Sequence, residues 1–101
     1  MLPALSNLNL SYNLITVVPP ELAARPLRLL DFAHNRIASI PTELMCCETL
    51  CALSLESNRL ATIPVVPVSM CAPLTAVDLG GNSLTALPDY LLALPRLAHL
   101  S

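Results

Sequence analysis

The sequence LCALSLESN at Leu50–Asn58 recurs along the chain at a nearly constant interval. Its other copies are LSNLNLSYN at Leu5–Asn13, LRLLDFAHN at Leu27–Asn35 and LTAVDLGGN at Leu74–Asn82. A partial copy, LAHLS, opens at Leu97. The asparagines that close the full copies are 22, 23 and 24 residues apart. Self-similarity at a period of this length predicts a solenoid, in which each repeat is one structural unit stacked on the next.

Apolar residues and prolines also recur at fixed positions around these phrases. The combined pattern reads LxxLxLxxNxLxxLPxxL, and its proline column is Pro19, Pro41, Pro64 and Pro88. This pattern resembles the leucine-rich repeat family, and the LPxxL segment resembles the intracellular type. The resemblance covers the whole chain. It implies an α/β leucine-rich-repeat solenoid, with a parallel β-sheet on the concave face and short helical turns or extended segments on the convex face.

The 101 residues are interpreted as one leucine-rich-repeat segment. Its repeats are expected at about 5–26, 27–49, 50–73 and 74–96, with a partial repeat at 97–101. Repeat arrays usually carry polar capping units at their ends, and neither end of this sequence contains one. We therefore expect the segment to belong to a longer array or to associate with itself end to end.

Each repeat also predicts its own local structure. The LxL core alternates apolar and polar residues, as a half-buried strand does. By resemblance, the Asn column of Asn13, Asn35, Asn58 and Asn82 hydrogen-bonds the backbone of adjacent turns as a buried ladder. The return segments after Pro19, Pro41 and Pro88 are predicted to form short helical turns or extended runs. Three prolines in ten residues predict an extended segment between Pro64 and Leu74.

Composition limits the classes of function. The net charge is −2 and the chain contains no lysine, so we expect no nucleic-acid partner. Although 54% of the residues are hydrophobic, they recur with the repeat and do not form the run of about 18 that crosses a membrane. We also find no signal peptide at the N-terminus. A cytoplasmic location without membrane association is the prediction.

The four cysteines do not have the spacing of a zinc site. Cys46, Cys47 and Cys51 form a CC-x3-C cluster and not paired CxxC motifs, so no metal or other cofactor is expected. Cys47 and Cys71 fall in a column that should be buried, where a free thiol packs as a small hydrophobe. A disulfide between these two cysteines is the alternative. Cys46 and Cys51 are expected to point outward, and the reduced state agrees with an intracellular protein.

The residues that point outward from the predicted strands form the candidate contact surface. Ala33 is expected to be one of these exposed residues. The chosen partner-binding residues are Asn9, Tyr12, Arg28, Asp31, His34, Ser54, Glu56 and Asp78. They make a mildly acidic strip that could accept a basic or polar segment of a protein partner, with Tyr12 and Arg28 as expected anchors. The alternative is that these side chains only keep the sheet soluble.

The sequence favours a protein–protein interaction module that displays these side chains rigidly. Two other interpretations stay open, namely a purely structural spacer in a larger array and a targeting arm for a catalytic domain outside this chain. We expect no enzymatic activity within the segment. His34, Cys51 and Asp31 could face the same side, but neither a glycine-rich phosphate loop nor an activated-serine motif accompanies them.

Overall fold

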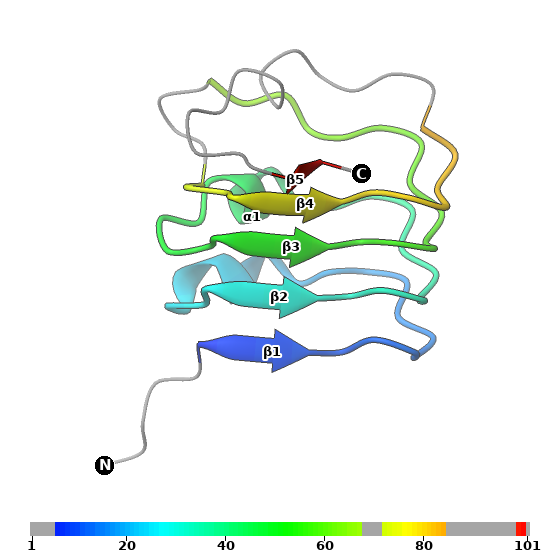
Figure 1. The fold of residues 1–101 in the computed structure, drawn as a ribbon, viewed down its shortest axis with the longest axis horizontal. Helices are drawn as coiled ribbons and strands as arrows, with labels where there is room; N and C mark the ends of the chain where they lie inside the picture. The colour runs from blue at the N-terminus through cyan, green and yellow to red at the C-terminus, as the bar shows by residue number, and fades with distance from the viewer. Residues whose placement is uncertain (1–5, 68–71, 85–98, 101) are drawn as a thin grey trace.

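The computed structural model describes residues 6–67, 72–84 and 99–100. In these residues, five strands form a single parallel sheet in which the spatial order equals the sequence order (Figure 1). The strands are β1 Asn7–Asn9, β2 Leu29–Asp31, β3 Ala52–Ser54, β4 Ala76–Asp78 and β5 His99–Leu100. Each strand pairs with the same strand of the next repeat, which confirms the predicted solenoid.

The strand register follows the sequence repeat without slippage. Leu8, Leu30, Leu53, Val77 and Leu100 pair in succession at the middle of the five strands. Leu30, Leu53 and Val77 are buried, whereas their strand neighbours are more exposed. Alternation with a period of two therefore gives the sheet an inner face that packs on the core and an outer face in solvent.

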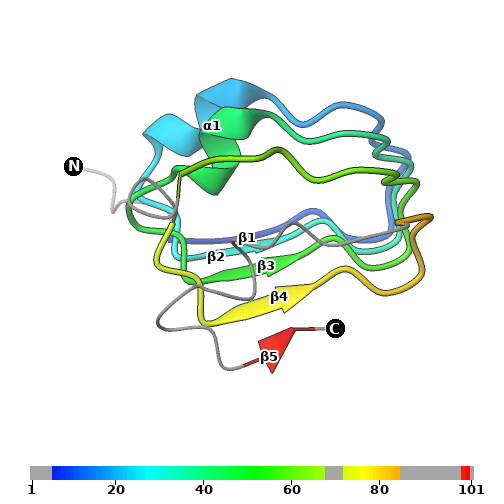
Figure 2. The same ribbon diagram turned by 90° about the horizontal axis from the view of Figure 1, so that it is seen from above.

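The core lies between the sheet and the returning chain. Phe32 and Leu55 follow their strands and are fully buried, as are Ile37 and Leu60 after the turn. Seen from above in Figure 2, the strands line one side of the molecule and the two short helices lie on the opposite side. We call the solvent-facing side of the sheet the concave face, because it corresponds to that face of the predicted repeat.

Two of the predicted helical turns are present on the convex side. The 3-10 helix η1 spans Pro20–Ala24, and the α-helix α1 spans Thr42–Met45. Each follows a proline, Pro19 or Pro41, whose φ of −65° or −71° suits the residue before a helix. In the third repeat the described residues 64–67 and 72–74 contain no helix, as the prolines predict. The turn predicted after Pro88 lies outside the described residues.

The recurring asparagine of the repeats ties successive turns together in the second, third and fourth repeats. The side-chain N–H groups of Asn58 donate to Leu55 O in its own turn and to Phe32 O in the preceding turn, both at 2.9 Å. Its side-chain oxygen accepts from Ile37 N at 3.1 Å. One buried side chain therefore satisfies backbone groups of two turns, which would otherwise be left without partners in the core.

The same bonds recur at Asn35 and Asn82. Asn13 differs, because it is exposed and donates only to Leu10 O and Ser11 O of its own turn. The predicted ladder bonds are confirmed for three asparagines, of which Asn35 and Asn58 are buried and Asn82 is half-buried, and the expectation of burial is wrong for Asn13. The physical reason is that each asparagine reaches toward the preceding turn, and the described residues place no turn before the first.

Asn58→Ala should lower the free energy of unfolding by about 3 kcal/mol or more, because it leaves several buried backbone groups unsatisfied. Asn13→Ala is the matched control and should cost about 1 kcal/mol or less, since its bonds are exposed. Urea denaturation of the two variants and the parent chain measures the difference. Equal losses for both variants would contradict the ladder.

Candidate functional site

The concave face consists of two rows of side chains that run across the strands. The strand register aligns Leu29, Ala52 and Ala76 in one row, which we call the apolar row. It aligns a second set, the acidic row, which is Asn9, Asp31, Ser54 and Asp78. Together the two rows over β2, β3 and β4 line an open hollow of about 430 Å³.

The small side chains of the apolar row shape this hollow. Leu29 is 40% exposed and stands beside two alanines, which are half-buried. The large Leu29 side chain therefore forms one wall of the hollow, and the small alanines leave space over β3 and β4. The hollow has an apolar side and a carboxylate side, as sites for a partner's side chain commonly have.

The acidic row has a structural role that the sequence analysis missed. Asp31 accepts a hydrogen bond from Ala33 N at 2.9 Å, and Asp78 accepts one from Gly80 N at 3.0 Å. Asn9 makes the same bond to Ser11 N at 2.9 Å. An Asp or Asn that bonds the backbone two residues later closes a local turn. The position of an Asp or Asn at the end of a strand, just before the chain turns, was the sequence signal that could have revealed this role.

These bonds leave the carboxylates available to a ligand. Each bond to Ala33 or Gly80 uses one oxygen of Asp31 or Asp78, and an ionised carboxylate has about four acceptor sites on two oxygens. Strands lie about 4.8 Å apart, so the two carboxylates are separated by roughly 10 Å across β3. The acidic row therefore combines a turn-closing role with a negative charge that faces solvent.

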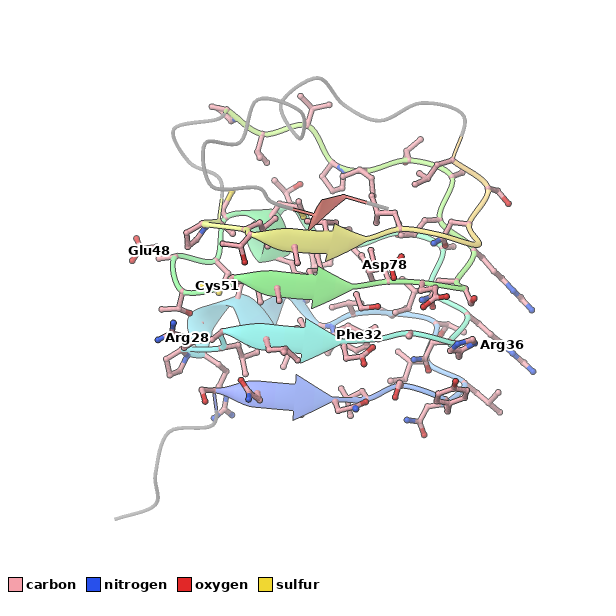
Figure 3. The ribbon with its side chains drawn as sticks, in the orientation of Figure 1. Arg28, Phe32, Arg36, Glu48, Cys51 and Asp78 are labelled. Atoms are coloured by element: carbon pink, nitrogen blue, oxygen red, sulfur yellow. The ribbon has the colours of Figure 1, made fainter. Side chains whose placement is uncertain are left out.

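The remaining predicted residues lie away from the acidic row. Arg28 directly precedes β2 and is exposed (Figure 3), whereas His34 lies beyond the opposite end of the same strand. Six residues of extended chain correspond to about 20 Å, so the side chains at the two ends cannot meet on one small ligand. Glu56 is exposed beyond the end of β3. The structure therefore brings four of the eight predicted residues together in the acidic row, and the other four lie outside it.

Tyr12 and His34 form an aromatic pair at the corner where the chain leaves the sheet. Their rings stack with centroids 4.3 Å apart and an interplanar angle of 12°. Both residues have a φ of +58°, and the equivalent Ser57 and Gly81 also have a positive φ. This left-handed conformation before each asparagine turns the chain, and it places Tyr12 and His34 one above the other.

Three further expectations about single residues need correction or remain open. Ala33 was expected to be exposed, but it is buried beside the turn that Asp31 closes. Cys46 was expected to point outward, but it is half-buried and packs against the core. Cys47 is buried as predicted and is a free thiol, while Cys71 lies outside the described residues. Cys51 is half-buried, and its thiol donates to Thr49 O at 3.5 Å.

The described residues contain no group of three or more side chains suited to hold a metal ion. His34 and Cys51 were considered as a catalytic pair. Cys51 directly precedes β3 (Figure 3), whereas His34 lies beyond the far end of the neighbouring strand β2. Within the part of the chain that the structure describes, no helix is long and apolar enough to span a membrane.

The stacked strands, the asparagine ladder and the sequence repeat all agree with one family. The family model for the leucine rich repeat matches residues 3–60, and the chain belongs to this family. Its matched part contains β1, β2, β3 and both convex helices.

Three relatives show similar segments. The chain is 37% identical over 102 aligned residues to mouse (Mus musculus) Podocan-like protein 1, an alignment that covers 98% of the chain. It is 36% identical to mouse Tsukushi over 60% of the chain, and 33% identical to a Caenorhabditis elegans leucine-rich repeat serine/threonine-protein kinase 1 over 93%. The matched segment spans 18% of each mouse protein and 4% of the kinase. These comparisons assign no catalytic step to the chain.

The turn-closing role of the acidic row can be separated from its charge. Asp31→Asn should leave the free energy of unfolding within about 0.5 kcal/mol of the parent, because Asn9 makes the same backbone bond in the same column. Asp31→Ala should lower it by about 1 kcal/mol, since the bond to Ala33 N is lost. Thermal and urea melts of the two variants test this order. If both variants were equally stable, the bond would have no structural importance.

Proposed function

We propose that this segment is a protein–protein interaction module whose concave face binds a partner through a basic or polar segment. The observation that carries the proposal is the hollow between the apolar and acidic rows over three adjacent strands. It offers cationic side chains of the partner the carboxylates of Asp31 and Asp78, and it offers the aliphatic parts of those side chains Leu29 and the alanines. Lys and Arg side chains have this combination of an apolar stem and a charged end.

The electrostatic balance of the surface supports a cationic group. The nine residues that line the hollow include two aspartates and no basic residue. Glu56 adds a further exposed carboxylate beyond β3. Complementary charge increases the rate of association and selects among partners more than it increases affinity, so we expect binding to weaken with added salt.

Rigidity of the sheet supports a binding role as well. The asparagine ladder and the in-register strands hold the two rows at fixed spacing. A surface that is already ordered loses little conformational entropy when a partner binds. The other predicted residues, Tyr12, His34 and Arg28, would then contact only a partner that extends beyond the hollow along the strands.

We also propose a cytoplasmic location, because the LPxxL segments of the sequence resemble those of intracellular repeats. The intracellular form of the repeat remains part of this proposal. Fractionation of cells that express the full-length protein would test it. Recovery from the secretory pathway would overturn it.

A targeting arm for a catalytic domain is a second candidate. The relative named as a serine/threonine-protein kinase contains a similar segment within a far longer chain. In such an arrangement the concave face would select the substrate of the attached domain. A purely structural spacer would differ from both, because substitutions on its concave face would change no binding event.

The experiment compares two triple variants that each remove three negative charges. The concave variant is Asp31→Asn/Glu56→Gln/Asp78→Asn, in which the asparagines retain the turn-closing bonds. The convex control is Glu21→Gln/Glu43→Gln/Glu48→Gln, drawn from exposed residues on other elements. Each form is immobilised in equal amount, exposed to cytosolic extract at low and high salt, and the retained proteins are quantified by mass spectrometry.

We expect at least one protein to be retained by the parent chain and the convex control, and to be reduced about tenfold or more on the concave variant. Its retention should also fall with salt. Circular dichroism melts establish that all three forms are folded. Identical sets of retained proteins on the three forms would contradict binding at the concave face and would favour the spacer. Analytical ultracentrifugation of the same samples tests the predicted end-to-end association.

A further inference from the structure

Exposed apolar side chains gather in the first turn, after the chain leaves strand β1. Tyr12, Leu14 and Val17 are 76%, 69% and 71% exposed, and they rank among the most exposed large hydrophobic residues of the described chain. At the position of Leu14 the later repeats carry Arg36, Arg59 and Ser83, and at the position of Val17 they carry Ser39, Thr62 and the small Ala86. The first repeat is therefore the one that places large apolar side chains at both positions.

Their exposure comes from the direction that these positions face. Arg36 and Ser39 occupy the same columns in the second turn, which has a described turn on each side, and both are exposed. A further turn stacked before β1 would thus leave Leu14 and Val17 accessible. An apolar group at such a position is unusual on a polar surface and indicates a contact site.

Two arginines stand beside this apolar group. Arg36 N donates to Ile15 O and Arg59 N donates to Ile37 O, each at 2.8 Å, so the two arginines hold equivalent positions on consecutive turns. Their backbones are roughly one strand spacing, about 4.8 Å, apart. Both are exposed, and neither forms an ion pair with any described residue, Glu56 included. Figure 3 shows Arg36 at the outer edge of the turn, away from the concave face.

The stacked rings of Tyr12 and His34 connect the apolar group to the arginines. Tyr12 belongs to the first turn and His34 to the second, two residues before Arg36. Stacking at 4.3 Å joins the two turns in a flat aromatic surface. Tyrosine and arginine are the residues most often found to dominate binding energy in protein interfaces.

We propose that this edge surface, formed by Tyr12, Leu14, Val17, His34, Arg36 and Arg59, binds an acidic peptide segment of a partner protein. The carboxylates of the peptide bind the two guanidinium groups, which present paired donors to carboxylates. An aliphatic or aromatic side chain of the peptide packs on Leu14, Val17 and the exposed ring. The edge surface thereby selects the opposite charge to the concave face, and the proposal does not depend on binding at that face.

A peptide suits the surface better than a nucleic acid. The chain has five basic residues and a net charge of −2, so it lacks the broad positive field that attracts a phosphate backbone. Two guanidinium groups beside three apolar side chains match a short segment that carries both acidic and apolar residues. Nucleic-acid binding is nevertheless a distinct outcome of the experiment.

The test selects 12-residue peptides displayed on phage against the 101-residue chain, and then measures the selected peptides by fluorescence polarisation. Arg36→Gln/Arg59→Gln removes the cationic pair. Leu14→Ser/Val17→Thr replaces the apolar side chains with residues that the chain itself carries at the equivalent Ser83 and Thr62. Arg36→Gln alone is matched by Arg25→Gln, which removes one positive charge near the end of η1. A labelled 20-nucleotide single-stranded DNA is measured in parallel.

We expect enrichment of peptides that combine Asp or Glu with Leu, Phe or Tyr. Their affinity should fall tenfold or more on the double arginine variant, and about fivefold on Leu14→Ser/Val17→Thr. Arg36→Gln should weaken binding while Arg25→Gln leaves it within twofold. The proposal is overturned if no acidic sequences are enriched, if the arginine variants bind the peptides as the parent does, or if only the DNA probe depends on Arg36 and Arg59.

Discussion

The hydrogen bonds of one asparagine side chain in each turn are the interaction on which the rest of the structure depends. In a solenoid the chain must bend sharply at the end of every strand, and the backbone at that bend points into the core. An unsatisfied buried N–H or C=O group costs free energy comparable to a lost hydrogen bond. Asn35, Asn58 and Asn82 remove that cost by donating to carbonyl groups of two turns and accepting from an N–H group of the preceding turn.

The bend has a second requirement, which is a left-handed residue immediately before each asparagine. Tyr12, His34 and Ser57 adopt this conformation although they are not glycines. The conformation is unfavourable for a residue with a side chain, and it persists because the ladder and the strands fix the chain on both sides. At the edge of the solenoid the rings of Tyr12 and His34 stack, and Arg36 and Arg59 hold equivalent positions on consecutive turns.

The fixed register gives two surfaces with opposite character. The concave face carries carboxylates beside an apolar row, and the edge surface carries guanidinium groups beside exposed apolar side chains. Both are assembled from residues that lie about one repeat apart in sequence and one strand spacing apart in space. A short chain can thereby display two surfaces of different charge, because stacking converts a sequence period into a continuous surface.

The resemblance to the leucine-rich repeat implied the asparagine ladder. The sequence alone determined the solenoid, the strand positions and the buried columns. These features follow from local periodicity, since an apolar residue at a fixed position of each repeat has only one face on which to be buried. It also indicated Asn9, Asp31, Ser54 and Asp78 as one row, because alternation along a strand and a constant register place them together.

Only the tertiary structure decided how the remaining predicted residues are arranged. The burial of Ala33 and Cys46 depends on how neighbouring segments pack, and no pattern within one repeat contains that information. The separation of Arg28 from His34 depends on which end of the strand each residue occupies. The edge surface emerged only from the structure, because the exposure of Leu14 and Val17 is set by the direction of the turn and not by their hydrophobicity.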